Sequence, residues 1–212
     1  MPKIKKIYVW QKQVRPADTY HYYTPTANTI AYYPLRDDID DYSWNWYNLA
    51  HDSWWTATYS NNMVISTDAL VYGTAMLPSY WNFTVWCWCY PSSWNGIYEN
   101  DSGWPLWFLC DISWEYKWNF KYWGAWYRLG STAEIAWPCH IMVTRSGSTF
   151  TIYINWQSNG TFSSSGTMNP RPKGFGINGF SNWVWWVIME SVAWSAQDIL
   201  DHYNYTKTNY WL

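Results

Sequence analysis

Charged side chains are scarce in this sequence: Asp, Glu, Lys and Arg make up 13% of its 212 residues, and the formal net charge is −2. Proteins that bind DNA or RNA normally gather Lys and Arg against the phosphates. The basic residues cluster only between Lys3 and Arg15, and we interpret this stretch as a solvated leading segment. The composition therefore argues against nucleic acid as a partner.

Long apolar runs are missing as well. The densest apolar stretch, residues 183–189, is far shorter than the roughly 20 residues of a membrane-spanning helix. The basic N-terminus is not followed by an apolar run of signal-peptide length. We expect no membrane span and no classical secretion signal, which leaves the location open, with a virion or a cell surface as alternatives.

Cysteine and histidine are too few and too scattered for a disulfide framework or a metal centre. Cys87 and Cys89 are two residues apart in a strand-like run, so they share one face at a separation that a disulfide rarely tolerates. Neither Cys110 nor Cys139 adds the second Cys or His pair that a zinc site needs. We expect buried free thiols, and we expect His140 to serve packing and hydrogen bonding.

Apolar residues, at 49% of the chain, are sufficient for a sizeable core and are arranged in β-type runs. We predict one helix at residues 195–203 and strands at residues 29–35, 82–90, 106–112, 139–144, 149–155 and 184–193. Many strands and a single helix, without β-α-β alternation, indicate one domain of the all-β class. The predicted fold is a two-sheet antiparallel β-sandwich with a short C-terminal helix.

Three segments predict local detail. Residues 82–90 alternate between two apolar faces, which is typical of a central strand covered on both sides. The strands at residues 139–144 and 149–155 are separated by only four residues, so we expect them to pair as a hairpin. Ser195 and Asp198 have the spacing of a capping box, with Asp in place of Glu, at the start of the helix.

Four segments, taken in order, resemble one family. They are AYYPL with the acidic turn and YSWNWYNL after it (residues 31–49), FTVWCWCYPS (83–92), HIMVTRSGSTFTIYIN (140–155) and IMESVAWSAQDI (188–199). They are similar to segments of laminin-G-like (LamG) domains in the concanavalin A-like lectin and glucanase superfamily. The resemblance implies a jelly roll. It divides the chain into an N-terminal lead or docking segment, residues 1–28, and a laminin-G-like jelly-roll domain, residues 29–212.

The resemblance also brings calcium into consideration, because laminin-G-like domains often bind it with Asp side chains and loop carbonyls at the sandwich rim. Four acids could supply the hard oxygen ligands that Ca²⁺ requires: Asp37, Asp38, Asp40 and Asp41. Where the family closes with an Asp-Glu pair, this chain has Met189 and Glu190, which removes one acid. The alternative, which we favour, is a solvated acidic turn.

A catalytic carboxylate pair is not evident. Related glucanases place two Glu around an Asp at alternate strand positions. The nearest match has Cys110 in the first acidic place and sets Asp111 and Glu115 four positions apart. No nucleophile elbow, phosphate-binding loop or dinucleotide fingerprint occurs. We expect that the protein is not an enzyme and does not hydrolyse β-glucans.

Tryptophan, with 22 residues, outnumbers glycine, with 11. Trp44, Trp46 and Trp156 stand where the family has turn glycines, which often need a positive φ. We hypothesise that the gene uses UGA for glycine and that these codons are translated here as tryptophan. The adjacent Trp54 and Trp55, in a short inter-strand turn, belong to the same group. Further candidates are Trp10, Trp81, Trp118, Trp183 and Trp211, whereas Trp88 and Trp194 suit a strand interior and a helix entry. The alternative is a Trp-rich protein whose indoles serve as sugar platforms.

The function that the sequence predicts is a non-catalytic recognition module for a glycan or another cell-surface polymer. The segment least like the family, residues 94–130, supplies the candidate ligand-binding residues: Tyr98, Asn100, Asp101, Trp104, Trp107 and Trp126. Partly buried edge packing is the alternative for these side chains. The alternative function is a structural, virion-associated protein such as a phage tail-fibre or surface-decoration domain, and assembly as a homo-oligomer stays open. Calcium is the only cofactor considered.

Overall fold

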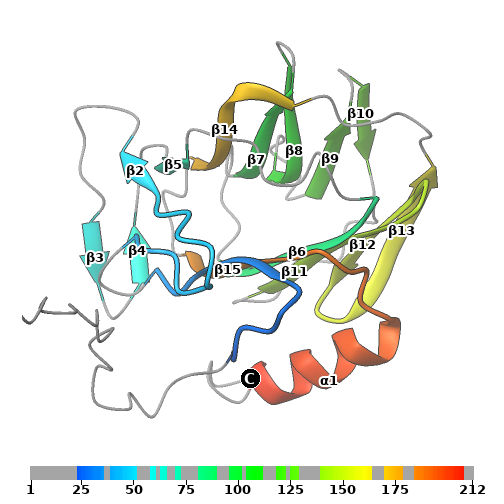
Figure 1. Cartoon of the computed structure of the whole chain (residues 1–212). Helices are drawn as coiled ribbons and strands as arrows, with labels where there is room; N and C mark the ends of the chain where they lie inside the picture. Colours follow the sequence, from blue (N-terminus) through cyan, green and yellow to red (C-terminus); the bar gives the residue numbers. More distant parts are fainter. Residues whose placement is uncertain are drawn as a thin grey trace, which may run out of the picture.

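The computed structural model describes residues 23–35, 39–51, 58–60, 63–65, 70–72, 81–89, 96–101, 104–111, 118–122, 125–128, 139–163, 170–178 and 184–207. Their strands form two antiparallel sheets (Figure 1). In spatial order the first sheet contains β13 (Gln157–Ser163), β12 (Thr149–Ile154), β11 (Cys139–Ser146), β6 (Asn82–Cys89), β15 (Val184–Glu190), β4 (Met63–Ile65) and β3 (Thr58–Ser60), with β1 (Thr29–Tyr33) also paired to β15. The second contains β10 (Ala125–Arg128), β9 (Trp118–Tyr122), β8 (Trp104–Asp111), β7 (Gly96–Asp101), β14 (Pro170–Asn178), β5 (Leu70–Tyr72) and β2 (Ala50–His51).

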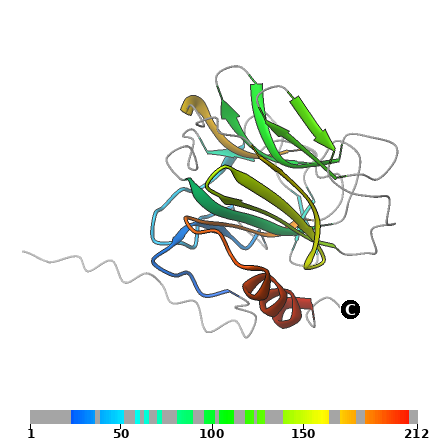
Figure 2. The same cartoon turned by 90° about the vertical axis from the view of Figure 1, so that its right-hand side faces the viewer.

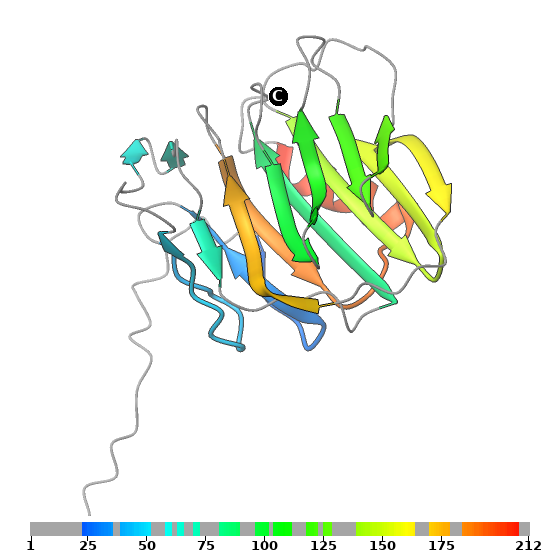
Figure 3. The same cartoon turned by 90° about the horizontal axis from the view of Figure 1, so that it is seen from above.

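The two sheets form the layers of a sandwich, and the helix α1 (Ala196–Lys207) lies below the first sheet, on the side away from the second (Figures 1 and 2). Seen from above, the strands of the second sheet lie over those of the first (Figure 3). The predicted fold class, an all-β sandwich of two antiparallel sheets with a short C-terminal helix, is confirmed. No helix among the described residues is both long enough and apolar enough to cross a membrane.

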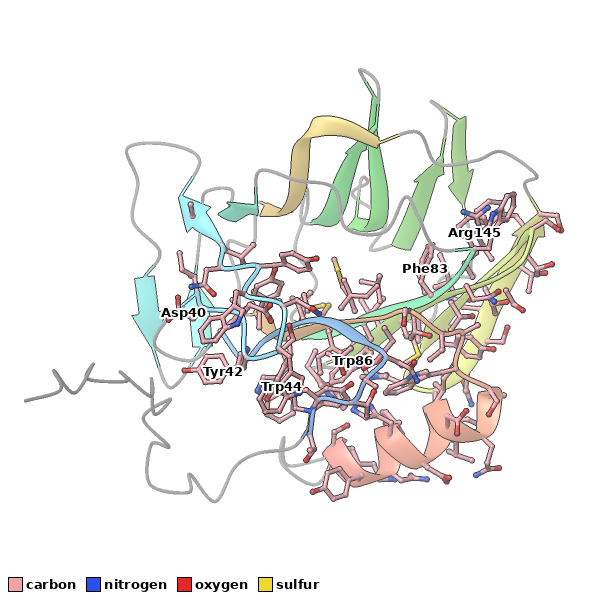
Figure 4. The ribbon with its side chains drawn as sticks, viewed as in Figure 1. Asp40, Tyr42, Trp44, Phe83, Trp86 and Arg145 are labelled. Atoms are coloured by element: carbon pink, nitrogen blue, oxygen red, sulfur yellow. The ribbon has the colours of Figure 1, made fainter. Side chains whose placement is uncertain are left out.

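Strand β6 is the central strand that its two apolar faces predict. It pairs with β11 on one side and β15 on the other, and all its residues after Asn82 are buried. Val85, Cys87 and Cys89 belong to the core cluster on one face. Trp86 and Trp88 belong to a second cluster on the other face, which also includes Ile199 of α1. Figure 4 shows Trp86 between the sheet and the helix. Both faces of β6 are therefore buried, as its two apolar faces predict for a central strand.

Strands β11 and β12 form the predicted hairpin, with Met142 opposite Tyr153 and Ser146 opposite Thr149. The turn is only Gly147–Ser148, two residues shorter than predicted, because Arg145 and Ser146 continue the strand. Gly147 has a φ of 59°, a conformation that glycine adopts without strain. The pairing prediction is confirmed, and the local turn is tighter than the sequence indicated.

The end of β15 differs from the prediction. We expected a strand to residue 193, but pairing ends at Glu190. Thr84 explains the change: its hydroxyl donates to the carbonyl of Val192 (2.8 Å) and accepts from the backbone N–H of Trp194 (2.9 Å). A side chain of β6 thus satisfies the backbone beyond Glu190 in place of a ladder partner.

The sequence of residues 169–172, Asn-Pro-Arg-Pro, predicts an interruption between strands, and this prediction is wrong. Strand β14 begins at Pro170 and pairs with both β7 and β5. The register shifts between Pro170 and Phe175, and irregular pairing at a strand start is where proline is tolerated. The short strands β2 to β5, and β7, β9, β10 and β13, were not predicted.

Helix α1 begins as predicted and ends four residues later than expected, at Lys207. The backbone N–H of Asp198 donates to Ser195 Oγ (3.2 Å), and the Ser195 backbone N–H donates to Asp198 Oδ2 (2.9 Å), which completes the capping box. The Ser195 hydroxyl also donates to Asp198 Oδ2 (2.6 Å), and this bond, together with the one from the Ser195 backbone N–H, lowers the pKa of Asp198. Ile199 is fully buried, and Trp88 Nε1 donates to Thr206 Oγ1 (3.2 Å), which holds the last turn of the helix on the sheet.

Candidate functional site

Three of the six predicted ligand-binding residues lie in one line across the second sheet. Tyr98 of β7 is opposite Trp107 of β8, Trp107 is opposite Lys121 of β9, and Lys121 is opposite Trp126 of β10. Directly opposed residues of antiparallel strands share a face of the sheet. We call Tyr98, Trp107, Lys121 and Trp126 the aromatic row. It spans four consecutive strands and brings together residues that are 28 positions apart in the chain.

The other three predicted residues divide between the two faces. Asn100 is two positions after Tyr98 on β7, so it shares the face of the aromatic row. Asp101 and Trp104 oppose each other at the β7–β8 hairpin end, and each is three positions from its row member, which places both on the other face. The sheet therefore assembles four of the six candidates and separates Asp101 and Trp104 from them.

The acidic turn is organised by Asp41, which is 5% exposed. Its Oδ1 accepts the backbone N–H groups of Tyr32 (2.9 Å) and Ser43 (2.8 Å). Its Oδ2 accepts the Ser43 hydroxyl (2.6 Å) and the backbone N–H of Tyr47 (2.9 Å). Four donors therefore occupy both carboxylate oxygens and fix the loop of residues 39–49 against β1.

Two of the four acids proposed for calcium lie in the described part of the chain. Asp40 is exposed, Asp41 is buried and engaged by the loop, and Asp37 and Asp38 lie outside the described residues. In the described part of the chain, no three His, Cys, Asp or Glu side chains gather as a metal site would require. A calcium site in this turn stays a prediction, with Asp41 acting mainly on the loop itself.

Beneath the first sheet lies a group that the sequence did not reveal, which we call the His–Trp cluster: Trp86, Trp88, His140, Trp194, His202 and Tyr203. The rings of His140 and His202 lie 5.4 Å apart, and His202 lies 4.1 Å from Trp86, between centroids. Within the described part of the chain, neither nitrogen of either imidazole has a hydrogen-bond partner. The expected packing role of His140 is confirmed, whereas hydrogen bonding by its ring is not found.

Burial makes both histidines poor bases. Desolvation lowers the pKa of His202 to about 3. It also lowers the pKa of His140 well below the ordinary value, with His202 as a second, electrostatic cause. Both rings are therefore neutral at pH 7.

Glu190, at the end of β15, is a buried acid on the same sheet. Its Oε1 accepts hydrogen bonds from the hydroxyls of Thr29 (2.8 Å) and Tyr23. Burial raises the pKa of Glu190 to about 8, so the carboxyl is largely protonated at pH 7. Glu190 thus ties the chain before β1 to the end of β15.

A Glu190→Gln variant should be more stable than the parent at alkaline pH. The unfolded parent releases the proton near pH 4.5 and the folded parent near pH 8, so the contribution of Glu190 falls as pH rises through this window. Glutamine mimics the protonated acid, so the variant should gain about 2 kcal/mol at pH 8, with allowance for solvent screening. Urea titrations at pH 4.5 and pH 8 measure it; an equal difference at both pH values would contradict this assignment.

The described cysteines match the prediction of buried free thiols. Cys87, Cys89 and Cys139 are unpaired and buried. The sulfur atoms of Cys89 and Cys139, on β6 and β11, lie 3.9 Å apart, so the two thiols share a hydrogen bond and are not joined by a disulfide. Burial raises the pKa of Cys87 and Cys89 well above the ordinary value, so these thiols pack in the core and are not reactive nucleophiles.

Catalytic carboxylates are not assembled by what the structure describes. Asp111 ends β8 opposite Trp118, and Glu115 lies outside the described residues. The aromatic row is the arrangement that brings the most predicted residues together. Sequence reasoning missed one of its members, Lys121, because nothing local to residues 118–122 indicates that β9 lies between β8 and β10.

No protein-family model matches the chain, and no curated protein matches it. Solved structures do match its fold. Domain 4 of AbnA, an extracellular arabinanase of glycoside hydrolase family 43 from Geobacillus stearothermophilus, solved with arabinotriose, superposes with a TM-score of 0.66 at 11% identity. The match covers 82% of this chain and 98% of that domain.

Two larger proteins contain a similar fold. The Trypanosoma rangeli sialidase matches with a TM-score of 0.62 at 15% identity, over 87% of this chain and 33% of the sialidase chain. The binding domain of botulinum neurotoxin DC, in complex with SialylT, matches with a TM-score of 0.57 at 16% identity, over 84% of this chain and 51% of that chain. At these identities the matches show that the three proteins share a β-sandwich fold with this chain.

Proposed function

We propose that this protein is a non-catalytic recognition module that binds a glycan on the aromatic row of its second sheet. The observation that carries the proposal is the register that sets Tyr98, Trp107 and Trp126 in one line. Aromatic faces stack on the C–H surfaces of sugars, and they supply affinity without charge. A domain with 13% charged residues has few other means of binding a polar polymer.

The spacing of the row suits a linear glycan running across the strands. Neighbouring strands lie about 4.8 Å apart, so Tyr98 and Trp107 are one interval apart and Trp107 and Trp126 two intervals, about 10 Å. These intervals are comparable to the lengths of one and two sugar units. Successive or alternate sugars of an extended chain would therefore meet an aromatic ring.

The register places the row and two neighbouring isoleucines on opposite faces of the sheet. Ile97 of β7 and Ile177 of β14 oppose each other and alternate with Tyr98 and Gly176. Apolar residues that alternate along a strand are those that normally turn towards the core. The other face then carries the row together with Asn100 and Lys121, which would orient the sugar hydroxyls.

The fold comparisons support the same class of ligand. The arabinanase domain was solved with arabinotriose and the neurotoxin domain with SialylT. Sialidase, which also contains this fold, is an enzyme, so the proposal of a non-catalytic role rests on the site. The laminin-G-like character of the domain and its presence on a virion or a cell surface remain part of this proposal.

Binding should depend on the row and not on tryptophan in general. Trp107→Ala and Trp126→Ala should each weaken glycan binding by about thirtyfold, the loss of about 2 kcal/mol expected of a central stacking residue. Trp104→Ala, on the same strand as Trp107 but on the other face, is the matched control and should bind like the parent. A glycan array that includes arabinotriose selects the probe, and calorimetry measures the affinities.

Two outcomes would contradict the proposal. Equal losses in all three folded variants would place the site elsewhere. No binding to any glycan by the folded parent would give first place to the structural, virion-associated alternative, which electron microscopy of regular assemblies would test. Hydrolysis of β-glucan lost on Asp111→Asn would show that the protein is an enzyme.

A further inference from the structure

Three tryptophans have a backbone conformation that side chains rarely adopt. The φ angles of Trp46, Trp156 and Trp186 are 62°, 69° and 40°. In the described part of the chain, the other non-glycine residues with positive φ are Leu35 and Asn155. Asn tolerates this region, whereas a bulky residue there is strained by the clash between Cβ and the backbone. Each of the three positions lies in a motif whose geometry calls for glycine.

Trp156 occupies the second position of a two-residue hairpin turn. Ile154 of β12 pairs with Gln157 of β13, which leaves Asn155 and Trp156 as the turn, both with positive φ. Positive φ at both positions is the signature of the type I′ turn, for which Asn-Gly is the strongly preferred sequence. Asn155 is held in place, because its Oδ1 accepts from His140 N (2.9 Å). The turn therefore has the expected Asn followed by tryptophan where glycine belongs.

Trp186 is the extra residue of a β-bulge. Trp185 pairs with Trp88, and Val187 pairs with Cys87. Two consecutive residues of β6 therefore face three residues of β15, and Trp186 is the one without a partner in the register. Bulges with a residue in the left-handed region have glycine there. No sequence argument indicated this position, because the bulge exists only in the pairing of β15 with β6.

Trp46 lies in the loop that Asp41 organises, and hydrogen bonds of the residues before and after it hold its backbone in place. Before it, Asn45 Nδ2 donates to the carbonyls of Thr29 (3.0 Å) and Ile30 (2.9 Å). After it, the Tyr47 N–H donates to Asp41 Oδ2. The indole of Trp46 is 67% exposed, so its burial offers little to offset the strain.

We propose that positions 46, 156 and 186 are glycine in the protein as its own cell makes it, encoded by UGA codons that the cell reads as glycine. The excess of Trp over Gly, 22 to 11, has the same explanation. The consequence for ligand binding is direct: the exposed indoles at positions 46 and 156 are not a sugar-binding surface. This inference rests on the backbone geometry of positions 46, 156 and 186, but the same coding DNA bears on the proposed glycan function, because the aromatic row requires UGG at Trp107 and Trp126.

The coding DNA and the natural protein test the proposal together. We expect UGA at the codons of residues 46, 156 and 186 and UGG at Trp88, whose side chain fills the core in an ordinary strand conformation. Mass spectrometry of peptides from the source cells or particles should then give the mass of glycine at positions 46 and 156. UGG at these codons, or tryptophan in the natural peptides, would overturn the proposal.

The conformational argument has its own test in the chain as printed. Trp46→Gly and Trp156→Gly should each raise the melting temperature by about 2–4 °C, because glycine relieves the strained φ. Trp44→Gly is the matched control: Trp44 is 70% exposed in the same loop and is not among the residues with positive φ. Its melting temperature should stay equal or fall. A fall in both Trp46→Gly and Trp156→Gly would remove the physical basis of the inference.

Discussion

Asp41→Ala should lower the free energy of unfolding by about 3 kcal/mol, because it removes the acceptor of four hydrogen bonds at once. Three of the donors are backbone N–H groups, and those that remain buried would lose their partner. Asp41→Asn should lower the free energy of unfolding nearly as much. Its amide nitrogen cannot accept hydrogen bonds, so two of the four donors would lose their acceptor. Chemical denaturation of each variant measures the loss.

Asp40→Asn is the matched control for this experiment. Asp40 is the exposed neighbour of Asp41, so its replacement should change the free energy by less than about 0.5 kcal/mol. A chelator separates the structural role from a calcium site: if hydrogen bonding explains the effect of Asp41, EDTA should leave the melting temperature of the parent unchanged. Equal losses in both variants, together with a chelator effect, would instead support calcium at the acidic turn.

Acid should unfold this protein through the His–Trp cluster. The pKa of both His140 and His202 is depressed in the folded state, so below pH 6.5 the unfolded chain binds protons that the folded chain does not. The stabilising contribution of the neutral rings is complete above pH 6.5 and is lost as pH falls towards 3. For His202 alone the loss is about 2 to 3 kcal/mol at pH 4.5.

Glu190 opposes this effect, because its stabilising contribution falls as pH rises from 4.5 to 8. The measurement therefore requires a variant in which residue 190 does not titrate. We therefore expect the clearest result in Glu190→Gln, whose free energy of unfolding should fall steadily from pH 7 to pH 4.5. Adding His202→Phe should flatten the profile, because the ring then cannot accept a proton. A slope that is unchanged by His202→Phe would show that other groups drive acid unfolding.

Local pattern alone determined much of the first sheet. The alternation of residues 82–90 predicted β6 and its two buried faces, the spacing of Ser195 and Asp198 predicted the capping box, and the cysteine spacing predicted free thiols. Each of these features depends on residues close together in the sequence, where side-chain period and cap chemistry act directly.

Only the tertiary structure decided the rest, because it depends on which distant strands become neighbours. The aromatic row exists because β7 to β10 pair in one register, and the same register divides Trp107 from Trp104. The contact of His140 with His202 requires α1 to pack under β11 and β6.

Local sequence also left open whether the tryptophans at turn positions are strained. The positive φ at position 156 follows from the hairpin of β12 and β13, and the positive φ at position 186 follows from the bulge of β15 against β6. Strand pairing is non-local, so no pattern within a single segment could specify it.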